Sequence, residues 1–212
     1  MQVIVRGFAD TGRDPHNDEL LESYPNHDMM SYALETWDPR YRRLWSKATH
    51  GFFKWHNTIV PHISTALADS RRVILIGDAC HAIDPSAGFG SALSMEDGFS
   101  LTECLRGASS LDDLPLLLGV FDKVMMQRAR AVGDYSIFMG RLLSTPDGPL
   151  QKARDRGMRL FDPNGVDARP NIKAKYGTPE WQAYLDDYDP AQALEEQRRA
   201  NVASTENLSP KL

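Results

Sequence analysis

The residues best suited to chemistry in this sequence lie in a glycine-rich loop near its middle. Asp78 follows an apolar run, Arg72–Gly77, that is typical of a strand covered on both faces. Gly88 and Gly90 come next, and a helix is predicted to begin near Ser91. A carboxylate in this place accepts hydrogen bonds from ligand hydroxyls, while the unpaired N–H groups at a helix start stabilise an electron-rich or anionic group. This order of residue types predicts a ligand site at the carboxyl end of a strand.

The glycine pattern alone does not establish that site. Gly88 and Gly90 form a G-x-G, but Leu93 stands where a dinucleotide-binding G-x-G-x-x-G needs its third glycine. A lone G-x-G after a strand is often only a turn. The residues by themselves therefore leave two interpretations open, a ligand-binding loop and a plain turn.

A longer pattern surrounds the loop. It consists of Arg72–His81, Pro85, Gly88–Gly90 and Met95–Gly98. This pattern resembles the GD motif of FAD-dependent monooxygenases, the single-component aromatic hydroxylases of the salicylate and 4-hydroxybenzoate type. Their motif runs from an apolar strand through G-D-A-A-H, a proline and G-x-G to a helix containing E-D. Weaker similarity on both sides extends the resemblance over most of residues 1–195.

The resemblance implies an FAD site and gives roles to its residues. Asp78 would bind the ribityl hydroxyls of FAD, and Pro85 would line the flavin ring. Backbone N–H groups of residues 88–92 would lie near the pyrimidine end of the isoalloxazine, where negative charge develops on reduction. The cofactor-binding residues expected in this way are Gly77, Asp78, Pro85, Gly88, Phe89, Gly90, Ser91 and Ala92. Cys80, Phe89 and Gly98 depart mildly from the family pattern, and the resemblance assigns no catalytic residue.

Two motifs of the family are not found in this sequence: the amino-terminal G-x-G-x-x-G that binds the ADP part of FAD, and a central Asp-Gly motif that serves FAD and NAD(P)H. We therefore expect the carboxyl-terminal half of such an enzyme, truncated relative to it. Residues 1–56 would be a remnant of the substrate-binding domain, residues 57–145 the carboxyl-terminal part of the FAD-binding domain, and residues 146–212 a polar extension and tail. The implied reaction is hydroxylation of a small aromatic or hydrophobic metabolite with NAD(P)H and O2, as in secondary metabolism.

Two other classes of function stay open. The first is a flavin-independent isomerase, cyclase or hydrolase of a biosynthetic pathway, with His56, His62, His81 and Asp84 as candidate acid–base groups. The second is an inactive partner subunit that associates with a missing amino-terminal half or forms a homodimer, because an exposed sheet edge favours association.

The expected fold class is mixed α/β: the carboxyl-terminal part of an FAD/NAD(P)-binding domain, a remnant of the substrate-domain sheet, and long closing helices. Strands are predicted at 3–8, 52–55 and 72–77, and helices at 39–48 and 91–106. A capping box at Ser110–Asp113 is predicted to open a second long helix of about 25 residues. Beyond Pro149 the sequence is polar, with one anchored patch at 181–185 and a disordered tail predicted over the last dozen residues.

The composition excludes several classes of protein. The chain has 212 residues, of which 42% are hydrophobic and 25% charged, as is normal for a soluble globular protein. Its net charge of −5 and lack of a basic run argue against nucleic acid as a partner. No apolar stretch approaches the roughly 20 residues that span a bilayer. Cys80 and Cys104 lack C-x-x-C spacing, so we expect buried thiols in a cytoplasmic setting rather than a disulfide or a zinc site.

Overall fold

The structure of the chain is a computed structural model. It describes residues 21–24, 35, 37–47, 52–55, 58–159, 176 and 178–207. The chain divides into two compact units, residues 1–57 and residues 58–212, and each is described by itself. The strand predicted at 3–8 lies outside the described residues. The assignment of the three predicted ranges to substrate and cofactor domains stays a prediction.

The first unit contains a small sheet and a short helix. β1 (Leu21–Tyr24) pairs antiparallel with β2 (Phe52–Trp55), which confirms the strand predicted at 52–55. α2 (Pro39–Trp45) begins where its sequence predicts, because the Asp38 carboxylate accepts a hydrogen bond from the N–H of Arg40 at 2.8 Å. A proline at the first helical position suits this start, since its missing N–H would have no partner there.

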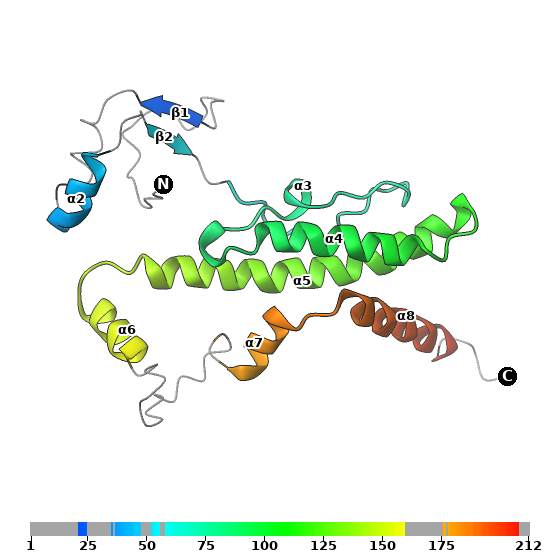
Figure 1. The fold of residues 1–212 in the computed structure, drawn as a ribbon. Coiled ribbons are helices and arrows are strands. Elements are labelled where there is room, and N and C mark those ends of the chain that lie inside the picture. The colour runs from blue at the N-terminus through cyan, green and yellow to red at the C-terminus, as the bar shows by residue number, and fades with distance from the viewer. Residues whose placement is uncertain are drawn as a thin grey trace. The chain divides into compact units, whose positions relative to one another are not determined.

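The second unit is helical over most of its described residues (Figure 1). Two long helices, α4 (Gly90–Leu105) and α5 (Leu114–Leu143), lie side by side and confirm the two long helices predicted from the sequence. The capping box at Ser110 is confirmed, with the Asp113 carboxylate accepting from the Ser110 N–H at 2.9 Å. The other elements of this unit are α3 (Asp78–His81), η1 (Pro85–Ala87), η2 (Leu111–Asp113), α6 (Pro149–Arg159), α7 (Pro179–Asp186) and α8 (Pro190–Asn207).

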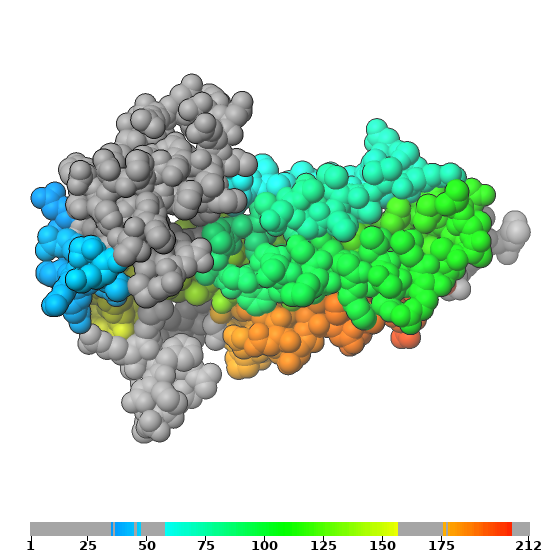
Figure 2. Space-filling view, turned by 45° about the horizontal axis from the view of Figure 1, so that its top comes forward, coloured from blue at the N-terminus to red at the C-terminus, as the bar shows by residue number. Residues whose placement is uncertain are grey.

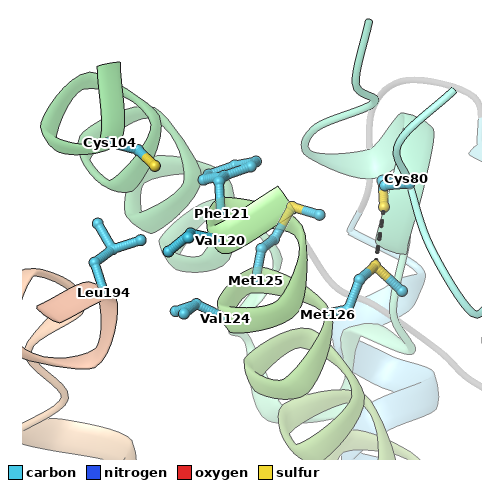
Figure 3. Close-up of a cluster of buried hydrophobic side chains, with 9 residues drawn as sticks. Cys80, Cys104, Val120, Phe121, Val124, Met125, Met126 and Leu194 are labelled. Atoms are coloured by element: carbon cyan, nitrogen blue, oxygen red, sulfur yellow. Dashed lines mark hydrogen bonds between the residues drawn. The ribbon is translucent and has the colours of Figure 1, made fainter. Parts of the chain in front are cut away.

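The main hydrophobic core surrounds the first half of α5 (Figure 3). Phe121 of α5 is fully buried in one cluster with Cys104 of α4 and Leu194 of α8. Cys80 of α3 contacts another side of α5, where its sulfur lies 3.6 Å from that of Met126. Burial raises the pKa of the Cys80 thiol to about 11, so this group is a neutral thiol at neutral pH. Both cysteines are buried and free, as predicted, and the core holds the start of the glycine loop against α5.

A second core attaches the carboxyl-terminal segment to the helical pair. Leu93 of α4 and Val132 of α5 pack with Trp181 and Leu185 of α7, which confirms the anchored patch. α8 continues along α4 and α5, and Figure 2 shows this orange segment beside the green helices. The disorder predicted for the last dozen residues is wrong in part, because residues 201–207 belong to α8. This helix packs against the main core through Leu194.

The strand predicted at 72–77 is wrong. Within the described part of the chain this segment forms one isolated antiparallel bridge, between Leu67 and Ile74, and Val73, Leu75 and Ile76 are 41–61% exposed. A doubly covered strand needs neighbours on both edges and a layer on each face. Among the residues that the structure describes, this segment has a neighbour on one edge, and the contact is limited to the bonds of Val73 and Leu75 with residues 66–68, so the doubly covered strand does not form.

The apolar residues at 91–106 also predict a helix that is buried on most sides, and this prediction is wrong, because Met95 and Phe99 of α4 are exposed. The mixed α/β class is therefore confirmed only in part: the described residues are mostly helical, and the paired strands lie in the first unit. Among these residues, no helix is both long and apolar enough to cross a membrane.

Candidate flavin-binding site

The first element of the candidate site is the turn at Gly77. This residue has φ +60° and ψ −148°, a conformation that L side chains rarely adopt, and a Cβ atom there would lie 3.3 Å from the Ser94 hydroxyl of α4. Its N–H donates to the Asp97 carboxylate at 2.8 Å. Its carbonyl accepts from the N–H groups of Cys80 and His81, both at 2.9 Å. The turn is thus bound to α4 on one side and begins α3 on the other.

Asp78 is the first residue of α3, and its side chain is exposed. No hydrogen bond joins its carboxylate to another residue that the structure describes. The carboxylate is therefore positioned to accept hydrogen bonds from ligand hydroxyls, which is the role that the resemblance implies toward the ribityl chain.

The proline loop is held by its own cap and by α5. The Asp84 carboxylate accepts from the N–H and the hydroxyl of Ser86, and Pro85 occupies the first position of η1. Ser136 of α5, fully buried, donates its hydroxyl to the Asp84 carbonyl at 2.6 Å and accepts from the N–H of Ala87 at 3.2 Å. Pro85 is exposed on a loop whose backbone is tied at both ends. The sequence did not indicate the role of Ser136, because Ser136 lies about 50 residues from the proline loop in sequence and on a helix face with an ordinary core pattern.

The start of α4 presents unpaired backbone donors. Gly88 has a left-handed φ of +75°, and Phe89, the N-cap of α4, makes no side-chain capping bond. The N–H groups of Gly90, Ser91 and Ala92 have no acceptor within the helix, as in any first turn, and no described residue supplies one. A Cβ atom at either glycine would meet no atom within 4 Å, so the space beside them is open. These donors carry the partial positive charge of the helix start.

The structure therefore brings the predicted cofactor-binding residues together around the first turns of α4. The one aromatic member, Phe89, packs its side chain against the second core, so its backbone rather than its ring lies at the site. Whether these residues bind FAD stays a prediction.

A buried histidine–carboxylate pair lies next to the Gly77 turn. Nε2 of His81 is 2.6 Å from Oδ2 of Asp97, and both side chains are almost completely buried. Burial lowers the pKa of His81, but the hydrogen bond and the charge of Asp97 outweigh it, so the pKa lies above its usual value of 6.5. Nδ1 of the same ring is buried without a hydrogen-bond partner. The sequence placed Asp97 in the motif without indicating what it does.

The acid–base candidates of the flavin-independent alternative lie near one another, but in little space. His62, His81 and Asp84 line a hollow of about 30 Å³ beside α5. That volume holds one water molecule and is far below the roughly 300 Å³ of a typical ligand pocket. His62 forms an exposed pair with Asp134 at 2.9 Å, and Asp84 serves as the cap of η1. The fourth candidate, His56, lies outside the described residues.

The arrangement fits a flavin better than it fits this alternative. An exposed carboxylate accepts hydroxyl hydrogens, and an adjoining row of helix N–H groups donates to an electron-rich ring edge. Open space beside Gly88 and Gly90 lets a flat ligand approach the backbone closely. The site can therefore bind a ligand, orient it and stabilise charge on it.

Comparison with known proteins agrees with this chemistry. Residues 56–110 match the family model of the FAD binding domain, and this segment contains the Gly77 turn, the proline loop and α4. The match confirms that this segment corresponds to part of an FAD binding domain, so FAD is the cofactor indicated for it.

Curated relatives carry the resemblance further. The chain is 26% identical over 160 residues to the FAD-dependent monooxygenase OpS4 of Beauveria bassiana, a match that covers 76% of this chain and 36% of that protein. It is 37% identical over 165 residues to the 3-amino-4-hydroxybenzoate 2-monooxygenase PtmB3 of Streptomyces platensis, with 65% and 40% covered. These matches confirm the relationship to FAD-dependent monooxygenases of the aromatic hydroxylase kind. The chain spans less than half the length of either relative.

A solved structure shows the same fold. The crystal structure of CtdE in complex with FAD and a substrate superposes with a TM-score of 0.62 at 20% sequence identity, covering 87% of this chain and 40% of that one. This likeness shows that the two proteins share a fold over the part they have in common.

Proposed function

We propose that the chain supplies the flavin-ring side of an FAD site in a monooxygenase that hydroxylates a small aromatic or hydrophobic metabolite with NAD(P)H and O2. One observation carries the proposal. Asp97 of α4 binds the Gly77 turn, which presents the Asp78 carboxylate, and the first turn of the same helix presents open N–H donors. The FAD binding domain match supports the cofactor, and the name of the relative PtmB3 supports an aromatic substrate. Free, buried thiols support a reducing, cytoplasmic setting.

In this proposal the residues of the chain bind and orient. Asp78 accepts hydrogen bonds from the ribityl hydroxyls, and Pro85 borders the ring on a loop that Ser136 keeps in place. The N–H groups of Gly90, Ser91 and Ala92 stabilise negative charge at the pyrimidine edge. When bound, FAD supplies the electron transfer and oxygen chemistry, while these groups hold it in one orientation.

We propose further that another polypeptide segment, or a second copy of the chain, completes the site. Among the described residues, the backbone of Val73 and Leu75 pairs on one edge, with the 66–68 segment, and their side chains are largely exposed. Met95 and Phe99 add exposed apolar surface on α4. An open edge and an apolar face favour association with a complementary sheet. In this proposal residues 1–56 contribute to a substrate-binding domain.

The proposal is tested by the visible absorbance spectrum of the purified chain, recorded before and after FAD is added and again with a polypeptide that carries an ADP-binding motif. We expect a protein-bound flavin spectrum in at least the last sample. A preparation that stays free of flavin under all three conditions contradicts the proposal.

A pair of carboxylate variants makes the test specific. Asp78→Ala removes the expected ribityl acceptor and should weaken FAD binding about tenfold, the value of one hydrogen bond to a charged group. Asp69→Ala removes an exposed carboxylate outside the loop and should leave binding unchanged. Equal FAD affinity of the two variants would argue against the role of Asp78.

A further inference from the structure

A single carboxylate oxygen links both halves of the candidate site. Oδ2 of Asp97, on α4, accepts a hydrogen bond from the N–H of Gly77 at 2.8 Å and lies 2.6 Å from Nε2 of His81. Asp97 is 4% exposed, and His81 is 6% exposed. Both partners belong to the segment that flanks Asp78, while Asp97 belongs to the helix whose first turn supplies the N–H donors. The distance between those two groups of ligand contacts is therefore set through this carboxylate.

We propose that Asp97, together with His81, is a positioning residue for flavin binding: it locks the turn that presents Asp78 against the helix that presents the backbone donors. The proposal rests on the proposed function for the identity of the ligand. Asp97 itself is buried, so it acts through Asp78 and the α4 backbone rather than by contact with the flavin.

The backbone conformation of Gly77 explains why a hydrogen bond to Asp97 is needed to hold the turn. Its φ of +60° is accessible to glycine at little cost, but glycine also has the largest choice of other conformations. The bond to Asp97 selects one orientation of the peptide that leads into Asp78. Without it, the Asp78 carboxylate would sample positions at varying distances from the start of α4.

Burial of the His81–Asp97 pair contributes little net free energy to folding. Burying a carboxylate and an imidazole costs desolvation that their mutual attraction only partly returns, and Nδ1 of His81 is left buried without a partner. An apolar contact of similar volume would hold α3 to α4 at lower cost. A role in geometry accounts for retaining the charged pair.

A matched control is present on α5. The Asp122 carboxylate, 8% exposed, accepts from the N–H of Ala66 at 2.8 Å and from the Thr65 hydroxyl at 2.7 Å. It holds a different loop by the same kind of bonds. Asp122→Ala should therefore reproduce the general destabilisation of Asp97→Ala without its effect on the Gly77 turn.

The experiment compares Asp97→Ala, Asp97→Asn and Asp122→Ala in the full chain by two readouts. The first is amide hydrogen exchange of residues 77 and 78 without flavin, which we expect to be at least about tenfold faster in Asp97→Ala and unchanged in Asp122→Ala. The second is the FAD dissociation constant, which we expect to rise at least about tenfold in Asp97→Ala alone. Asn keeps an acceptor oxygen in place, so Asp97→Asn should restore most of the affinity.

A double variant separates positioning from general damage. If Asp97 acts through Asp78, then Asp78→Ala with Asp97→Ala should weaken FAD binding little more than Asp78→Ala alone, because the two losses are not additive. Additive losses, an unchanged FAD affinity in Asp97→Ala, or an equal loss in Asp122→Ala would each overturn the proposal. If the wild-type chain binds no FAD under any condition, the proposed function fails. In that case the amide hydrogen exchange of residue 77 tests the positioning role by itself, and an unchanged exchange rate in Asp97→Ala overturns the positioning role.

Discussion

Replacement of Arg128 by alanine is expected to loosen the carboxyl-terminal segment from the helical pair. Arg128 of α5 is buried, and its Nε and Nη2 donate to the two carboxylate oxygens of Glu96 at 2.9 Å each. Nη1 and Nη2 also donate to the carbonyls of Tyr184 and Leu185, at 2.6 Å and 3.2 Å. The guanidinium carbon lies 4.0 Å from the centre of the Tyr188 ring. One side chain thus joins α4, α5 and the end of α7.

The size of the effect follows from what the substitution leaves behind. Removing one member of a buried ion pair costs about 3–5 kcal/mol, because the other charge stays desolvated. Glu96 is 22% exposed, so water reaches it, and we place the loss for Arg128→Ala at the lower end, about 3 kcal/mol. Arg128→Lys keeps the charge but cannot span the carboxylate and both carbonyls, so we expect a loss of about 1–2 kcal/mol.

The assay is urea unfolding followed by circular dichroism, with Arg199→Ala as the control. Arg199 pairs with Glu195 on α8, where both side chains are exposed, so its loss should cost no more than about 0.5 kcal/mol. Proteolysis within residues 178–207 should accelerate in Arg128→Ala and stay unchanged in the control. A loss below about 1 kcal/mol for Arg128→Ala, or one equal to that of Arg199→Ala, would refute the reasoning, since surface substitutions reach that range.

Two further predictions concern the Gly77 turn. The pKa of His81 is raised in the folded protein, so the free energy of unfolding should be highest below about pH 6.5 and fall as the pH rises through the folded pKa. Asp97→Asn should flatten that fall, and urea midpoints measured between about pH 6 and 8 test it; an identical slope in the variant contradicts the assignment to His81. Gly77→Ala should cost about 1–2 kcal/mol because of its positive φ, whereas Gly98→Ala, within α4 and with open space around it, should stabilise by about 0.5–1 kcal/mol. The same sign for both glycine variants in thermal unfolding would contradict this account.

The sequence determined the local features of the loop, because each depends on neighbours a few residues away. Asp84 before Pro85 predicts a capped turn, and Ser110 with Asp113 predicts a helix start; both are present. The resemblance of the pattern around Asp78 to the GD motif implies a flavin site, and the match of residues 56–110 to the FAD binding domain agrees with it. The start of α2 followed for the same reason, since a side-chain cap is a local signal, whereas α2 ends at Trp45 and not at the predicted residue 48.

Only the tertiary structure decided which distant residues hold that loop and which surfaces stay open. Asp97 and Ser136 act across 20 and 49 residues of sequence, and no pattern in the chain pairs them with Gly77 and Ala87. The apolar run at 72–77 illustrates the converse, since its composition predicts a buried strand that only neighbours on both edges can complete. Hydrogen-bond satisfaction and burial depend on what surrounds a residue in space, whereas caps and turns depend on its neighbours along the chain.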